Sequence, residues 1–204
     1  MPYVMTIDQR GSRVHGDHVE AFLLELAQML GSREHGVVRA FERAVGDEVQ
    51  GVLDDPDLVV DVAMTVSRGG GWSVGIGAGP VDEPLPESVR AGYGTAFILA
   101  RTAVEAAKSR SRSVSLAVRG IDDGAGRDAE AVLVLAAAAA ARRSPAGWEV
   151  VDAMAAPGVR QEDVATSLGV SQQAVSQRLR AALWAEETAA RSAAARLLRI
   201  AAGE

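Results

Sequence analysis

The sequence contains no cysteine, which excludes a disulfide framework, a thiolate metal site and a cysteine nucleophile. It also lacks a long uninterrupted apolar run. The longest one, over residues 129–141, contains Glu130, whereas a membrane span needs about 20 apolar residues. The N-terminus has no basic segment and reaches an acid at Asp8, so it does not resemble a signal peptide. We therefore expect a soluble, cytoplasmic protein that does not interact with a membrane.

Basic residues are not in excess either. The 204 residues include 21 Lys and Arg against 27 Asp and Glu, for a formal net charge of -6. This balance excludes a generally basic protein that coats nucleic acid, but it permits a sequence-specific DNA-binding protein with one local basic face. Residues 142–204 hold eight arginines and seven acids, so the acidic excess belongs to the rest of the chain.

The hydrophobic pattern changes near residue 122. Before it, short β-type runs alternate with helical ones in the order β-α-β-β-α-β-α-β, with strands predicted at 3–8, 37–44, 48–53, 72–76 and 113–118 and helices at 18–30, 56–67 and 94–108. The first six elements follow the order of the split βαβ, ferredoxin-like arrangement. After a Gly- and Asp-rich linker over 120–128, every segment is helical. We therefore predict an α+β fold with two domains, over 1–122 and 123–204.

Residues 160–183 predict a helix-turn-helix. Gly169 stands where the C-terminus of a first helix needs a positive φ, and Ser171 can cap the helix that follows. Small and branched apolar residues on both helices would form the contact between them: Val164, Ala165, Leu168, Val170, Ala174, Val175 and Leu179. Because no alternating run with a hairpin turn follows Leu183, we expect no wing.

The side chains left facing outward suit DNA. Glutamines and a serine at the start of the second helix can contact base edges, and Gln161 at the start of the first helix is placed for a phosphate. The candidate DNA-binding residues are Arg160, Gln161, Ser171, Gln172, Gln173, Ser176, Gln177, Arg178 and Arg180. The alternative is an ordinary helical hairpin with a solvated polar face. An outward face of three glutamines and one serine, without an acid, favours DNA.

This stretch resembles the helix-turn-helix of phage-repressor-type regulators and of region 4 of sigma factors. The resemblance covers about 25 residues, through the pattern Gln161-x2-Val164-Ala165-x2-Leu168-Gly169-Val170-Ser171-x2-Ala174-Val175-Ser176-x2-Leu179. In those families the second helix reads DNA. The resemblance therefore implies a base-reading role for Gln172, Gln173, Ser176 and Gln177.

The first half of the chain resembles class III nucleotidyl cyclases and diguanylate cyclases. A first strand ends in Ile7-Asp8, a hairpin carries Val45-Gly46-Asp47-Glu48, and a later strand reads Val74-Gly75-Ile76-Gly77-Ala78-Gly79-Pro80-Val81. In that family two acids hold the metal ions that bind the triphosphate. The resemblance implies Asp8 and Asp47 as metal ligands, with Mg²⁺ and a nucleotide as the bound groups. Each acid also has an ordinary interpretation, as a residue at a strand end or in a hairpin turn.

The sequence departs from the cyclase pattern in the helix that follows Gly94. The positions of the family's Asn and Arg are Ile98 and Thr102, and Arg101 lies about 100° away around the helix. Without that cation, the charge that develops on the phosphates loses its main protein partner. The start Asp8-x3-Ser12-Arg13 and the Gly-Asp-Glu hairpin are similar instead to the SatD-like proteins.

Two arginines beside the first acid are candidate phosphate ligands. Arg10 and Arg13 flank a Gly-Ser turn and can bind a phosphate, or else form surface ion pairs with Asp47 or Glu48.

The last helix is predicted to run from Ser171 well past Leu183. Its apolar residues Trp184, Leu197, Leu198 and Ile200 either pack on the N-terminal domain or form the seam of a homodimer, which the usual two-fold sites of helix-turn-helix proteins favour. The resulting hypothesis is a sequence-specific, dimeric DNA-binding transcriptional regulator with an inactive cyclase-like sensor or dimerisation domain. The alternatives are a Mg²⁺-dependent nucleotide-binding or cyclase-type enzyme that uses Asp8 and Asp47, and a pure partner-binding module.

Overall fold

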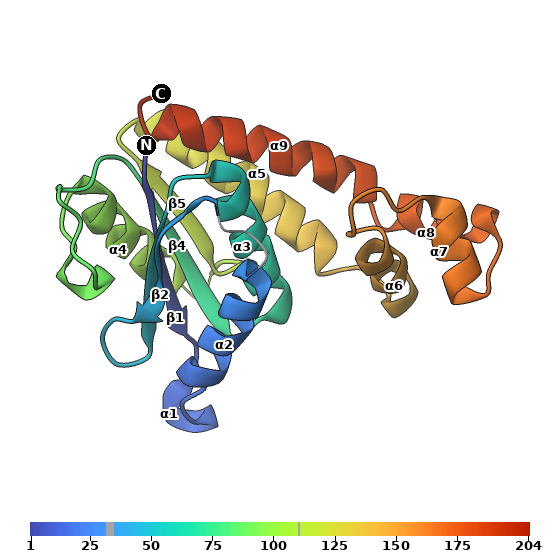
Figure 1. The fold of residues 1–204 in the computed structure, drawn as a ribbon, viewed down its shortest axis with the longest axis horizontal. Helices are drawn as coiled ribbons and strands as arrows, with labels where there is room; N and C mark the ends of the chain where they lie inside the picture. The colour runs from blue at the N-terminus through green and yellow to red at the C-terminus, as the bar shows by residue number, and fades with distance from the viewer. Residues whose placement is uncertain (32–34, 110) are drawn as a thin grey trace.

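The computed structural model describes residues 1–31, 35–109 and 111–204 and shows a mixed α/β fold built on one five-stranded sheet (Figure 1). The strands are β1 (Tyr3–Gln9), β2 (Val37–Arg43), β3 (Glu48–Leu53), β4 (Trp72–Ala78) and β5 (Leu116–Gly120). The helices are α1 (Ser12–His15), α2 (Val19–Leu30), α3 (Pro56–Gly69), the 3-10 turn η1 (Val89–Ala91), α4 (Thr95–Ala107), α5 (Asp123–Ala140), α6 (Pro145–Ala153), α7 (Gln161–Leu168), α8 (Gln172–Ala181) and α9 (Trp184–Ala201). The α+β class agrees with the sequence prediction.

The strands lie in the order β2-β3-β1-β4-β5. β1 is antiparallel to both β3 and β4, β2 is antiparallel to β3, and β5 is parallel to β4. The central position of β1 explains why its residues are nearly all buried, as a strand between two neighbours in a covered sheet must be. The structure confirms five strands in the predicted sequence along the chain, although β5 begins three residues later than the predicted run of 113–118.

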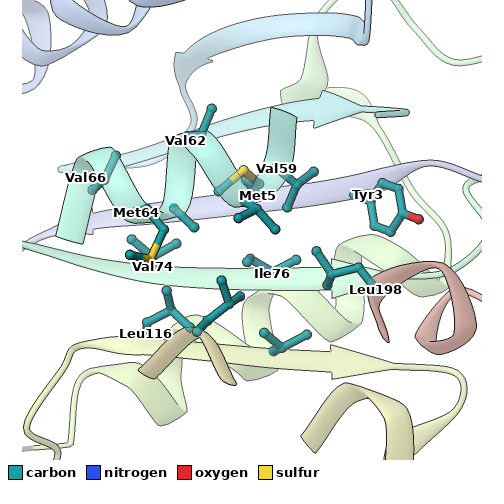
Figure 2. Packing of buried hydrophobic residues seen from close by; sticks show 14 of the residues in the cluster. Tyr3, Met5, Val59, Val62, Met64, Val66, Val74, Ile76, Leu116 and Leu198 are labelled. Carbon is teal, nitrogen blue, oxygen red and sulfur yellow. The ribbon is translucent and has the colours of Figure 1, made fainter. Parts of the chain in front are cut away.

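Helices cover both faces of the sheet. Tyr3, Met5 and Ile7 belong to the main core together with residues of α2, α3, α5 and α9. Figure 2 shows Tyr3 and Met5 with Val59 of α3 and Leu198 of α9. Val4 points to the other face, where it packs with residues of η1 and α4. Because successive side chains of β1 point to opposite faces of the sheet, the strand contributes residues to two cores.

Most of the predicted linker over 120–128 is instead the start of α5, which begins at Asp123. The Asp122 side chain accepts a hydrogen bond from the Ala125 N–H at 2.9 Å and caps the helix. A Cβ at Gly126 would lie 2.9 Å from the Gly120 amide nitrogen, so the glycine allows α5 to pass close to the end of β5. These glycines reflect close packing rather than a flexible connection.

The predicted long helix from Ser171 onward is wrong in one respect, because the chain turns at Leu183. This residue has a φ of +53°, which separates α8 from α9. α9 then returns alongside α5 to the start of the chain (Figure 1). Leu198 is fully buried and Leu197 packs against the same core, so α9 buries apolar residues within its own chain. The homodimer stays a prediction without support from this helix.

α6, α7 and α8 lie together at one end of the molecule, away from the sheet (Figure 1). They have a core of their own, formed by Val150, Val164, Ala165, Val175 and Leu179. α5 and α9 follow the predicted domain boundary at residue 122, but they share the core of the sheet. The two-domain division stays a prediction, and the helices with a separate core are α6 to α8.

The closest approach between helix and sheet is that of α4 to β4. A Cβ at Gly75 would lie 2.6 Å from the Ala100 carbonyl oxygen, and a Cβ at Gly77 would overlap the Ala96 oxygen and the Ala100 nitrogen. Alanines on α4 complete the contact, since Ala96 and Ala100 are fully buried. The glycines of β4 are therefore required by packing.

We expect Gly77→Ala to lower the free energy of unfolding by about 3 kcal/mol, because the added methyl group forces α4 away from the sheet. Urea denaturation monitored by circular dichroism measures this change. Gly69→Ala is the matched control, because a Cβ there meets nothing within 4 Å. Equal stabilities of the two variants would contradict this account of the α4 contact.

Candidate nucleic-acid interface and acidic cluster

The turn between α7 and α8 has the geometry that the sequence predicts. Gly169 adopts the left-handed conformation with φ +64°, and the Val170 N–H donates to the Ala165 carbonyl at 3.0 Å. The Ser171 hydroxyl accepts from the Ala174 N–H at 3.1 Å, so it caps α8. The Ser171 side chain therefore positions the helix.

The first half of α8 presents most of the predicted base-reading side chains to solvent. Gln172, Gln173 and Gln177 are exposed, and Ser176 is half-buried. Val175 and Leu179 are buried on the opposite side of the helix, against α6 and α7. α8 is thus amphipathic, with an amide-rich outer face.

The predicted phosphate contacts differ in how free their side chains are. Arg160 forms ion pairs with Glu162 and Asp163. The half-buried Arg178 forms an ion pair with Glu149 of α6, with 3.0 Å between Nη1 and Oε2. Arg180 is exposed, and within the described ranges it forms no ion pair. Gln161 is half-buried at the first position of α7.

A second polar cluster lies at the far end of the sheet, beside α1. Asp8 in β1 stands opposite Glu48 in β3 and Ser73 in β4, so the three side chains share the face that α4 covers. The Lys108 ammonium at the end of α4 lies 3.0 Å from the Asp8 carboxylate and 2.7 Å from that of Glu105. The sequence prediction missed Glu48, Ser73 and Lys108, although Lys108 is conspicuous as the only lysine.

Burial changes the acidity of both strand acids. Burial raises the pKa of Asp8, the contact with Lys108 lowers it, and the Asp47 carboxylate raises it further. Burial likewise raises the pKa of Glu48, which Arg101 and Lys108 oppose. Within the described part of the chain the buried Glu48 Oε1 atom has no hydrogen-bond partner, and the Arg101 Nη2 atom lies 4.0 Å from it. Holding Glu48 ionised is therefore unfavourable in the folded protein.

Asp47 lies near Asp8, but its carboxylate and its backbone carbonyl accept hydrogen bonds from other groups. Its carboxylate accepts a hydrogen bond from the Ser12 hydroxyl, and its backbone carbonyl accepts one from the Gln9 N–H at 3.2 Å. A cavity of about 570 Å³ opens beside Asp8 and Lys108, and Asp47 does not line it. The Asp47 carboxylate thus affects the pKa of Asp8, but Asp8 lines the cavity and Asp47 does not.

The residues present do not fit the pair of magnesium ions that the cyclase resemblance implies. Mg²⁺ prefers several oxygen ligands, whereas Asp8 contacts an ammonium group. Among the residues that the structure describes, no group of three or more His, Asp or Glu side chains has the arrangement of a metal site. Ile98 is 69% exposed, and the Thr102 hydroxyl donates to the Ile98 carbonyl, so neither supplies the missing cation.

The predicted phosphate ligands occupy different places. Arg10 lines the cavity beside Asp8, together with His15, whereas the exposed Arg13 does not line it. In the described part of the chain neither arginine forms an ion pair with Asp47 or Glu48. Of the two arginines, Arg10 is therefore the one that could meet a ligand in this cavity.

Comparisons with family models, curated proteins and solved structures gave no match for this chain. Within the described residues, no helix is long and apolar enough to cross a membrane. The functional argument therefore depends on the residues and their geometry.

We expect Glu48→Gln to raise the melting temperature at pH 7. A raised pKa means that the folded state binds the proton more tightly than the unfolded chain, so stability falls as the pH rises through that pKa. The glutamine cannot ionise, so the variant does not lose this stability. Its gain in melting temperature over the parent should shrink below pH 4.5, the ordinary pKa of a glutamate. Thermal denaturation across pH 3 to 8 measures it (roughly the window in which carboxyl groups titrate). Glu25→Gln, at an exposed position of α2, is the control. A gain that is the same at every pH would contradict this explanation.

Proposed function

We propose that the protein is a sequence-specific DNA-binding transcriptional regulator in which α7 and α8 form a helix-turn-helix. The observation that carries the proposal is the exposed amide face of α8, formed by Gln172, Gln173 and Gln177. Glutamine side chains can donate to and accept from adenine in the major groove. The buried opposite face fixes the orientation of the helix, so these side chains are presented together.

Double-stranded DNA is the proposed partner, bound by a homodimer on two half-sites. One helix-turn-helix offers few contacts, and two-fold sites about 34 Å apart are usual for this motif. Arg180 is the exposed candidate for a phosphate contact, while Arg160 and Arg178 would have to exchange their acidic partners for phosphates. Backbone contacts of this kind position the helix, and base contacts specify the sequence.

For the first half of the chain we propose a ferredoxin-like unit, extended by α4 and β5, that acts as a sensor or dimerisation domain. The support is the order β2-β3-β1-β4 with every neighbouring pair antiparallel, together with the chain order of the elements. Lys108 at the Asp8 carboxylate favours a non-catalytic role for this unit. A nucleotide is one candidate effector, and Arg10 is placed at the cavity that would receive its phosphate.

We expect Gln172→Ala and Gln173→Ala each to weaken specific binding by about tenfold, because each lost base contact costs about 1–3 kcal/mol. A mobility-shift assay on genomic fragments first identifies a bound fragment and then measures the variants against it. Gln28→Ala is the matched control, since Gln28 is also exposed but lies on α2, one of the helices that pack against the sheet. Specific binding that survives both changes would contradict the assignment of α8.

Glu149→Gln should strengthen DNA binding several-fold, because it releases Arg178 from its ion pair and removes a negative charge beside α8. If Arg178 then contacts a phosphate, the slope of log Kobs against log salt becomes steeper by about 0.9. Titrations at several salt concentrations measure both effects. The double variant with Arg178→Ala should lose the steeper slope and keep only the smaller gain from the removed negative charge, and an equally steep slope there would argue against this contact.

A further inference from the structure

A cleft of about 420 Å³ lies where α6 meets helices that pack on the sheet. We call the sheet and the helices packed on it the sheet layer. α3, α5 and α9 form one side of the cleft, and α6 forms the other. The volume is within the usual range for small-molecule sites, which occur preferentially at junctions of this kind. The side chains that carry the argument are Met64, Arg68, Arg143, Trp148, Trp184 and Arg191.

One donor in this cleft lacks an acceptor. The Arg143 side chain is 2% exposed, its Nε donates to the Ala182 carbonyl at 2.8 Å, and its Nη2 pairs with Glu187. Its Nη1 is buried and has no hydrogen-bond partner among the residues that the structure describes. The acids that line the cleft are already paired, Asp152 with Arg68, Glu187 with Arg143 and Arg191, and Asp61 with Arg191. Among the described residues, the Arg143 Nη1 is therefore the donor in this cleft that still needs an acceptor.

An aromatic ring packs against the guanidinium group that carries the unmet donor. The Trp148 ring contacts two guanidinium groups, with its centroid 3.6 Å from the Arg68 Cζ and 4.7 Å from the Arg143 Cζ. An aromatic ring that contacts two cations is stabilised by both. Apolar side chains of the sheet layer, Met64 among them, line the cleft beside Trp148. The same surroundings suit a second planar ring.

We propose that this cleft is an effector site for a small aromatic carboxylate. The carboxylate accepts from the Arg143 Nη1, and the ring lies against Met64 and Trp184. Because Nη1 is buried and Trp148 packs against the same guanidinium group, the ligand displaces that ring as it enters. Trp148 belongs to α6, which packs against α8, so displacement moves the helices that carry the glutamines. The effect on DNA rests on the proposed function, whereas the ligand site does not.

Isothermal titration calorimetry with 2-naphthoate and benzoate tests the site on the full chain. We expect saturable binding of 2-naphthoate, and about tenfold weaker binding of its neutral isostere 2-naphthamide, because a charge-assisted hydrogen bond is lost. Arg143→Lys keeps a cation for Glu187 but lacks Nη1, so it should also bind 2-naphthoate about tenfold more weakly. The control is Arg142→Lys, since its exposed side chain is next in the chain and does not line the cleft. No saturable binding of either carboxylate at millimolar concentration would overturn the proposal, as would equal binding of acid and amide.

A second variant gives a change in the opposite direction. Trp148→Leu uncovers Nη1, so we expect tighter binding of 2-naphthoate, which a partly unfolded protein would not show. Unchanged or weaker binding in a variant that melts cooperatively would overturn the role given to this ring. 2-naphthoate should also change the affinity of the protein for its DNA fragment. If the carboxylate binds but no fragment is bound specifically, the site stands and the proposed function fails.

Discussion

The packing of α9 against α5 determines where α6, α7 and α8 are held. The two helices run antiparallel, so the end of α9 meets the start of α5, where the Asp122 N–H donates to the Ala201 carbonyl at 3.1 Å. Alanines line the contact on both helices and allow a close approach. The three shorter helices are therefore an insertion between two long ones, anchored to the sheet at both of their ends.

A buried ion pair fixes the other end of this frame. Arg143 follows α5 and Glu187 lies in the first turn of α9, and their side chains are 2% and 9% exposed. Burying two charges is unfavourable unless both are paired in good geometry, so this contact adds orientation more than stability. Because Arg143 also binds the Ala182 carbonyl just after α8, the direction in which α8 points is coupled to the sheet layer.

The sequence predicted the local structure better than the packing. The alternation of strands and helices and the Gly169-Val170-Ser171 turn are local signals, and the structure has both of them where they were expected. The turn at Leu183 carries no such signal, because a leucine with positive φ is rare. The contact between Asp8 and Lys108 joins residues 100 positions apart, and only the position of α4 over β1 brings them together. Tertiary contacts of this kind decide the site chemistry and are not visible in periodicity.

The two polar regions of the molecule therefore have different physical characters. Beside α1, the half-buried Asp8 carboxylate is paired with a lysine of the same chain, although burial still raises its pKa. Around α8, exposed amides and arginines have partners only at the surface, where an ion pair contributes little and can be exchanged. Since the acidic excess lies in the first 141 residues, it repels a polyanion from the sheet layer and leaves α8 as the favourable approach. In the proposed function, the few free cations there mean that affinity for DNA comes mainly from base contacts and from two reading helices, with a modest dependence on salt.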